Sequence, residues 1–396
     1  MQIRQIDKEF FYMAMTSRER ILTAMRGGKA DHVPISPDIS VMVPDRLDGR
    51  PFYDIHLDGR EHNGWTSATH AEVYVKAVKY FQMDGFYMYG GLKQIRQEDT
   101  PDFVSEIFDI PEGKLVKRIC RTPVGEMTEE EIYFTDEPPW RQLKPIKDLQ
   151  KDFEKMKYYM GNGKWKWEKN YNDRERIGEL GIYMGMIPVF QDWWFNYRQG
   201  GFEQCFMDFM LEPEFMQGVH EYWMQWALDN VRAMVVAKPD VIMLGGSSAS
   251  LSVSSPEIFR RYELPFIQKA AKICRAAGIP SHLHVCGKSW QLLEMVAEES
   301  ELDSMEPLEE ASTGNVDMAE AKRRYGKKLC LKGNINTTEF MLRAAPKEIE
   351  EKCKFLIDAA AQDGGFILST GDQCGRDTPD ENLFKMVEVA KTYGKY

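Results

Sequence analysis

Eight short apolar segments, most of them separated by amphipathic helical patterns, recur along this chain of 396 residues. Short apolar runs of this kind are typical of strands that are buried on both faces of a parallel sheet. Strands that alternate with helices predict a (β/α)8 TIM barrel, and the length fits an elaborated barrel. The expected strands are Val33–Pro37, Gly85–Tyr89, Ile182–Val189, Val241–Leu244, Ser281–Val285, Leu302–Met305, Lys328–Lys332 and Phe366–Ser369.

The helical patterns between the strands support the same fold. Pro256–Ala277, Ser289–Glu299 and Pro346–Ala361 are the clearest of them. A helix is also expected from Thr16 to Met25, with Ser or Thr as its N-cap and Gly27 near its end. An open doubly wound sheet is the alternative architecture, but no expected strand is followed by Gly-x-Gly-x-x-Gly. We therefore expect residues 1–30 to form an N-terminal helical extension and residues 31–396 to form one barrel domain.

One stretch, about residues 91–160, departs from the alternation of strand and helix. Phe103–Phe108, Leu115–Cys120 and Glu131–Phe134 have the pattern of short antiparallel strands joined by turns that contain Pro and Gly. We expect an antiparallel β insertion after the second strand, on the face where barrel loops carry function. Decoration of the barrel without a functional role explains the pattern equally well.

The strongest chemical signal is His284-Val285-Cys286-Gly287, together with a distant Cys374. Alternation along a strand places His284 and Cys286 on the same face. One imidazole and two thiolates are the ligands of an open, three-coordinate zinc site, which leaves a fourth position for substrate or water. The competing interpretation is that His284 and Cys286 are core residues and that Cys374 is a loop cysteine. The expected position of these residues in the barrel favours the metal site.

Several further polar or small residues lie at or just past the carboxyl ends of the expected strands, where barrel active sites are built. His282 lies one layer below His284, so we expect it to be a core residue or a neighbour of the ligands. Cys330 alternates with Lys332 and Asn334, so we expect it to be a core residue. Cys330 would replace Cys374 if Cys374 did not bind the metal. The residues at the strand ends are Asp38, Tyr89, Asp192, Gly245, Cys286, Glu306, Asn334 and Cys374.

Composition excludes several classes of function. The formal net charge is −11 without a basic stripe, which argues against a nucleic-acid partner. No apolar run reaches the length of a membrane span, and residues 1–15 lack the pattern of a signal peptide. The seven cysteines form no close pairs, which is typical of reduced thiols. We therefore expect a cytoplasmic protein.

The motifs resemble those of the uroporphyrinogen decarboxylase-like superfamily, and specifically its corrinoid-dependent methyltransferase branch. The resemblance runs from about Thr16 to the C-terminus and is weakest at 91–180. His-x-Cys-Gly with a distant Cys is its specific part, and the other motifs mark only the superfamily. The segments that carry it are Thr16–Ile21, Asp31–Pro34, Ser255–Phe259, Leu264–Phe266, His284–Gly287, Gly333–Ile335 and Cys374.

The resemblance implies a zinc enzyme that works beside a separate corrinoid protein. His284, Cys286 and Cys374 would hold zinc, which would activate a thiol acceptor or a methyl-ether donor. Glu306, Asp192 and Asn334 are the expected catalytic residues. Glu306 is either a displaceable fourth ligand or a carboxylate on the surface or beside the ligands, and the sequence leaves both roles open.

The substrate pocket is less constrained by the sequence. Asp38 and Tyr89 are expected to line it, together with Trp193 and Trp194 from the aromatic segment Phe190–Tyr197. That segment would wall a pocket for a methoxylated aromatic or cap the mouth where the corrinoid docks, but aromatic stripes are more often packing.

Two alternative functions follow from the same residues. The decarboxylase itself must neutralise a substrate with many carboxylates, and the superfamily does so with arginines after the first strand. Here the segment Ile35–Pro44 contains no cation and carries Asp38. A lyase or decarboxylase that acts on a small acid remains as one alternative. A non-enzymatic docking subunit for a corrinoid protein is the other.

Overall fold

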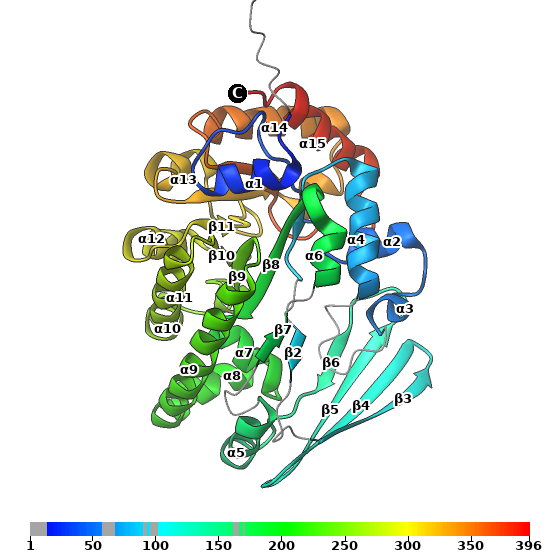
Figure 1. The fold of residues 1–396 in the computed structure, drawn as a ribbon, viewed down its shortest axis with the longest axis vertical. Helices are drawn as coiled ribbons and strands as arrows, with labels where there is room; N and C mark the ends of the chain where they lie inside the picture. Colours follow the sequence, from blue (N-terminus) through cyan, green and yellow to red (C-terminus); the bar gives the residue numbers. More distant parts are fainter. Residues whose placement is uncertain (1–13, 58–67, 90–92, 96–101, 161–165, 169–170) are drawn as a thin grey trace, which may run out of the picture.

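The computed structural model describes residues 14–57, 68–89, 93–95, 102–160, 166–168 and 171–396. Seven parallel strands form its curled central sheet, in the order β1-β8-β9-β10-β11-β12-β13 (Figure 1). Each expected strand from Gly85–Tyr89 onward is present, which confirms the parallel α/β architecture. The strands are β1 Gly85–Tyr87, β8 Gly181–Pro188, β9 Val241–Gly245, β10 Ser281–His284, β11 Ser304–Glu306, β12 Cys330–Ile335 and β13 Phe366–Thr370.

The first expected strand, Val33–Pro37, is the exception. Ile35 forms a single parallel bridge with Leu368 of β13, and the Ile35 carbonyl accepts a hydrogen bond from the backbone N–H of Asp84 at 2.8 Å. This segment therefore lies between β13 and β1, but it does not complete a strand. Pro34 and Pro37 have no N–H to donate to a ladder. The closed eight-stranded barrel is thus replaced by seven strands and one bridged segment.

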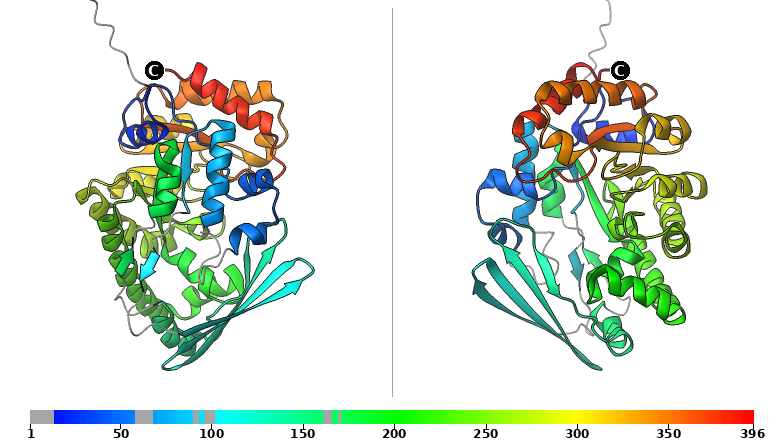
Figure 2. Two further views of the ribbon diagram at one scale, coloured as in Figure 1. Left: turned by 45° about the vertical axis from the view of Figure 1, so that its right-hand side comes forward. Right: turned by 180° about the vertical axis from the view of Figure 1, so that it is seen from behind.

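Helices follow most strands and cover the outer face of the sheet (Figures 1 and 2). The layer between the strands and these helices holds the larger apolar core. The longer helices are α4 Ala68–Phe81, α8 Gly201–Leu211, α9 Pro213–Ala237, α11 Leu264–Ala276, α12 Trp290–Glu299, α14 Pro346–Ala360 and α15 Asp380–Thr392. The shorter ones are α2 Met42–Asp48, α3 Phe52–His56, α6 Tyr171–Ile177, α7 Phe190–Tyr197, α10 Pro256–Ile258 and α13 Met318–Tyr325. There are also 3₁₀-helices at Gly178–Leu180 and Ser247–Ala249 and π-helices at Phe259–Glu263 (η3) and Thr337–Met341.

The expected N-terminal helix is present as α1 Ser17–Met25. Thr16 Oγ1 accepts from the Glu19 N–H at 3.2 Å, and Glu19 Oε2 accepts from the Thr16 N–H at 2.9 Å, which forms a capping box. Ile21 and Met25 pack into a second apolar cluster with Phe86 of β1. This helix therefore closes the inner face of the curled sheet at one end. Residues 1–13 of the expected extension lie outside the described residues.

The antiparallel insertion is present after β1, as the sequence predicts. It contains β3 Asp102–Ile110, β4 Gly113–Thr122 and β5 Gly125–Phe134, and helix α5 Leu149–Tyr159 follows it. A fourth strand, β6 Trp140–Leu143, was not expected, because its four residues follow a turn and lack apolar alternation. A separate pair, β2 Lys93–Ile95 and β7 Lys166–Glu168, adds two short antiparallel strands.

The insertion lies at the end of the molecule toward which the parallel strands run. In Figure 1, β8 runs downward to α7, and the four-stranded sheet lies at the lower right, opposite α1 and α14 at the top. Figure 2 shows the same separation from two other sides. Among the described residues, no helix combines the length and apolar character that crossing a bilayer requires.

Arg20 of α1 holds the bridged segment in place. Its guanidinium contacts Asp31 at 2.7 Å and also binds Asp84, whose second oxygen accepts from the Ile35 N–H at 2.9 Å. The Arg20 and Asp84 side chains are 8% and 4% exposed. A buried carboxylate that loses its partner is expensive.

Arg20→Met should therefore lower the free energy of unfolding by about 3 kcal/mol, because it leaves Asp84 unpaired in the interior. The exposed Arg26, the C-cap of the same helix, is the matched control, and Arg26→Met should change stability by less than about 0.5 kcal/mol. Urea denaturation followed by circular dichroism measures both values. Equal, small effects in the two variants would contradict this role of Arg20.

Candidate metal and active site

The candidate site lies at the carboxyl ends of β10, β11 and β13. On β10, His282 and His284 face the inside of the curled sheet, and Leu283 packs in the outer core. Cys286 follows two residues after His284 and is half-buried. The strand therefore delivers an imidazole and a thiol to the same end of the sheet, as alternation predicted.

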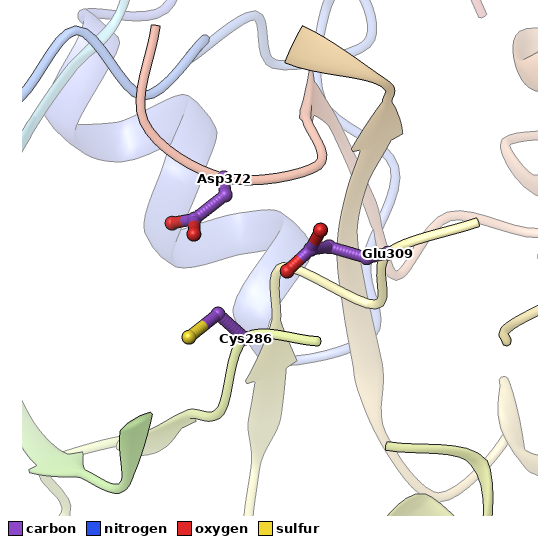
Figure 3. A group of neighbouring side chains, drawn as sticks. All are labelled: Cys286, Glu309 and Asp372. Carbon is purple, nitrogen blue, oxygen red and sulfur yellow. The ribbon is translucent and has the colours of Figure 1, made fainter. Parts of the chain in front are cut away.

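Three loops bring ligand-type side chains together around Cys286. The Cys286 thiol and the carboxylates of Glu309 and Asp372 have ligand atoms within 4.8 Å of one another (Figure 3). They follow β10, β11 and β13 respectively. Glu309 is held by a hydrogen bond from the Gly287 N–H. Asp372 has a φ angle of +133°, a backbone conformation that L-residues rarely adopt.

Glu309 and Asp372 were not expected from the sequence. Each had a weak signal: Glu309 is three residues past Glu306, and Asp372 is two residues before Cys374. Burial raises the pKa of Asp372 to about 6, and the neighbouring carboxylates of Asp38 and Glu309 act in the same direction. A nearby cation would stabilise the ionised form of a carboxylate in this environment.

His284 lies beside Cys286 and Glu306. Its Nδ1 is 3.2 Å from Glu306 Oε1, and its ring also lies beside the Cys286 thiol. Burial lowers the pKa of His284, but these two contacts and the charge of Glu306 raise it well above its usual range. His284 and Cys286, two of the three expected ligands, are therefore adjacent.

Cys374, the third expected ligand, is fully buried and is not among the three residues whose ligand atoms gather within 4.8 Å. Its backbone N–H donates to the Asp38 carbonyl at 2.8 Å, and its thiol contacts the hydroxyls of Thr370 and Thr378. Burial and the charge of Asp38 raise the pKa of its thiol to about 12. Cys374 is thus at the same end of the sheet as Asp372, two residues away along the chain. Cys330, the alternative to Cys374, lies in the inner apolar cluster.

Glu306 makes three polar contacts with neighbouring strands. Its Oε1 is 3.2 Å from Nε2 of His282 and 3.2 Å from Nδ1 of His284, and its Oε2 accepts from the Lys332 ammonium. Burial raises the pKa of Glu306, but Lys332 and His282 reverse this effect and hold the pKa well below its usual range. His282 therefore contacts Glu306 in the layer below the expected ligands.

Asp38 and Tyr89 lie at the same end of the sheet. Asp38 is buried and accepts from the Ser40 hydroxyl. Burial raises the pKa of Asp38, while the positive charges of Lys332 and His284 oppose that shift. Burial raises the pKa of the half-buried Tyr89, and the charge of Asp38 adds to this effect. Asp38 therefore joins the electrostatic neighbourhood of His284 and Glu306.

Asp192 and Asn334 connect the elements of the site. Asp192, in the first turn of α7, accepts from the backbone N–H of Ser247 at 3.0 Å and from that of Ser248. Asn334 is buried, and its Nδ2 donates to the Leu308 carbonyl at 2.8 Å. Asp192 thereby fixes the loop after β9, and Asn334 fixes the loop that carries Glu309. Gly245 ends β9 and lies close to Asp192, so a side chain there would meet its carboxylate at 3.8 Å.

Trp193 and Trp194 are 1% and 0% exposed. Trp194 Nε1 donates to Asp208 of α8 at 3.1 Å. The Trp193 ring packs against Phe190 and Tyr197, with centroid distances of 6.1 and 5.8 Å. The contacts of both indoles lie within the helical layer, and their role in a substrate pocket stays a prediction.

Known proteins share sequence and fold with this chain. Residues 197–393 match the family model for uroporphyrinogen decarboxylase (URO-D). Over 96% of this chain and 99% of the other, the fold superposes on a methyltransferase from Methanosarcina mazei with a TM-score of 0.65 and 18% sequence identity. The similarity to the family model therefore covers just under half of the chain, and the similarity to the methyltransferase structure is one of fold.

Parts of the chain are also similar in sequence to curated proteins. Methylcobamide:CoM methyltransferase MtbA of Methanosarcina mazei is 28% identical over 41% of this chain, and MtaA of Methanosarcina barkeri is 28% identical over 42%. The alignments cover only 44% and 46% of those relatives, so this chain spans less than half their length. A uroporphyrinogen decarboxylase of Actinobacillus pleuropneumoniae is 31% identical over 20% of the chain. The chain is thus similar over part of its length to methylcobamide:CoM methyltransferases and, over a shorter part, to a uroporphyrinogen decarboxylase.

Glu263 positions the helix that carries Asp192. It lies at the end of η3, is fully buried, and accepts from the backbone N–H groups of Phe190 at 2.8 Å and Gln191 at 3.0 Å. Burial raises the pKa of Glu263 to about 8, with a further contribution from Asp192, despite these two hydrogen bonds.

The folded-state pKa of this acid lies above its unfolded value, so its contribution to stability is lost as the pH rises through 8. Between pH 7 and pH 9 the native protein should lose about 1.4 kcal/mol of unfolding free energy through Glu263. Glu263→Gln should lack this part of the pH dependence, as measured by urea denaturation at both pH values. The exposed Glu257 is the control, since Glu257→Gln should keep the wild-type slope. Identical slopes in the wild type and Glu263→Gln would contradict the assignment.

Proposed function

We propose that this chain is a zinc-dependent methyltransferase that moves a methyl group between a corrinoid protein and a small substrate. The observation that carries the proposal is the gathering of the Cys286 thiol with the carboxylates of Glu309 and Asp372 at one end of a parallel sheet, with His284 beside Cys286 but outside that group. Curated relatives named methylcobamide:CoM methyltransferases support the reaction class. The substrate is a thiol acceptor or a methyl-ether donor.

The donor set fits zinc. Imidazole and thiolate are preferred zinc ligands, and carboxylate oxygens complete many zinc sites. His284, Cys286 and Cys374 would hold the ion, while Glu309 and Asp372 are placed beside the Cys286 thiol. When bound, zinc would supply a Lewis acid that favours a thiolate form of the substrate or polarises an ether oxygen.

The chain's own residues supply position and charge. Glu306 Oε1 lies 3.2 Å from His284 Nδ1 and 3.2 Å from His282 Nε2, and Asp192 holds the loop after β9 through two backbone N–H groups. Asp38, Glu309 and Asp372 surround the site with carboxylates. This arrangement favours a bound cation and disfavours a substrate that presents an anion to these carboxylates.

A decarboxylase activity on a tetrapyrrole is the second candidate, because the family model and one group of relatives have that name. The segment Ile35–Pro44 argues against it, since it contains no Lys or Arg. Its buried Asp38 would repel a polycarboxylate. A lyase that acts on a small acid would require no cobalamin, whereas the proposed methyltransferase requires a corrinoid. Dependence on cobalamin therefore separates these two functions.

A docking subunit without catalysis is the remaining alternative. Four protein ligands that saturate the metal would support a structural role, whereas an open or easily displaced position would support an enzyme. The half-buried Cys286 and Asp372 favour the open site, because both side chains retain contact with solvent.

The purified protein should contain about one zinc ion per chain. His284→Ala and Cys374→Ser should each lose most of it, because each removes a ligand. Cys353 is a buried thiol on α14, so Cys353→Ser is the matched control and should retain zinc. Elemental analysis after dialysis measures the content. Full occupancy in both ligand variants would refute this ligand set, whereas loss only in Cys286→Ser would direct attention to Glu309 and Asp372.

Methyl transfer should be visible in the cobalamin spectrum. Addition of the enzyme to methylcob(III)alamin with a thiol, or to cob(I)alamin with an aryl methyl ether, should change the absorbance as the cobalt gains or loses its methyl group. His284→Ala should abolish the change, and Cys353→Ser should preserve it. No change with either substrate class would favour the small-acid lyase or the docking subunit.

A further inference from the structure

A buried charged group lies directly below the expected ligands, and its lysine, Lys332, has no part in the function proposed above. Lys332 of β12, Glu306 of β11 and His282 of β10 have side chains that are 1%, 1% and 0% exposed. The Lys332 ammonium binds Glu306 Oε2, while Oε1 lies 3.2 Å from His282 Nε2 and from His284 Nδ1. Both oxygens of this carboxylate are therefore engaged by neighbouring strands.

Lys332 is held from two sides. Its ammonium lies 4.4 Å from the centroid of the Phe86 ring of β1 and binds Glu306 on the other side. Phe86 also contacts the His282 ring, with a centroid distance of 5.3 Å. A buried lysine with a cation–π contact and an ion pair is fixed in position, and it supplies the charge that a buried carboxylate requires.

We propose that Lys332 is a positioning residue, which fixes Glu306 as the hydrogen-bond acceptor for His284 Nδ1–H and leaves His284 Nε2 to bind the metal. This inference rests on the proposed zinc function. It gives Glu306 the role of orienting His284. The sequence alone had also allowed Glu306 to be a displaceable fourth zinc ligand. Such a carboxylate–histidine pair fixes both the tautomer and the ring orientation of a metal-binding imidazole.

The arrangement of the other carboxylates supports this division of roles. Glu309 and Asp372 are the carboxylates whose oxygens lie within 4.8 Å of the Cys286 thiol, and Glu306 is not in that group. Glu306 faces His284 from the adjacent strand, since the two residues are register partners in the parallel β10–β11 pair. Oxygen ligands for the open position therefore come from the loops, while the strand supplies the orienting carboxylate.

Lys332→Met tests the proposal, because methionine fills a similar volume and removes the charge. Zinc affinity, measured by competition with a chromophoric chelator, should fall by about 10- to 100-fold. In the zinc-loaded protein, ¹⁵N NMR should show that His284 Nδ1–H loses its protection from solvent exchange. A lysine that only stabilised the fold would not change either value in a folded variant.

Lys322→Met is the matched control, since Lys322 is a partly buried lysine that donates to the Gly364 carbonyl, ahead of β13 at the opposite end of the sheet. Its zinc affinity should equal that of the wild type. Wild-type affinity and Nδ1–H protection in a folded Lys332→Met would overturn the inference.

Glu306→Gln provides a second test if Lys332→Met does not fold. Zinc affinity should fall by a similar factor, while X-ray absorption should show the same number of zinc ligands as in the wild type. Loss of one oxygen ligand would make Glu306 a direct ligand and overturn the inference. A wild type that binds no zinc would remove the proposed function and this inference together. Failure of methyl transfer with these zinc results intact would count only against the proposed reaction.

Discussion

The parallel register of β10, β11 and β12 is the constraint on which the site depends. His284 is the partner of Glu306, and His282 is the partner of Ser304, so inward-facing residues of adjacent strands lie side by side. Ser304 is in turn the partner of Cys330. A slip of one residue in either pair would turn the polar residues outward into the apolar helical layer, which would bury charge without partners. The register of the strands, the burial of the side chains and the pairing of the charges therefore all favour the same arrangement.

The inner face of the sheet changes character along its length. At one end α1 covers an apolar layer that includes Phe86, Met184 and Met243. The next layer toward the carboxyl ends of the strands is the charged one, formed by His282, Glu306 and Lys332. The loops with Cys286 and Asp372 lie beyond the strand ends. A buried ion pair contributes little net stability. This layer is better explained by the orientation it gives to His284 than by the stability of the fold.

Three segments at this end of the sheet are fixed by hydrogen bonds from their backbone N–H groups to carboxylates. Asp192 holds the turn after β9, Glu309 holds the turn at Gly287, and Glu263 holds the start of α7. Each bond connects segments that follow different strands, so the end of the sheet forms one connected unit. A preorganised unit of this kind suits methyl transfer, in which the reacting atoms must approach in a fixed geometry. The four-stranded insertion lies at the same end of the molecule (Figure 2).

The sequence by itself determined the parallel strands, because short apolar runs bounded by turns are a local signal. It also determined that His284 and Cys286 lie at the same end of β10, because they are only two residues apart along the chain. It could not determine the contacts of Glu306, which depend on the register between three strands. Glu309 and Asp372 were missed because irregular loops after different strands bring them to Cys286, and no periodicity encodes that meeting. The first expected strand was reduced to a bridge at Ile35 and β6 was added, because pairing depends on which neighbours offer free backbone groups. Local pattern fixed the elements, and only the tertiary structure decided which charges face one another.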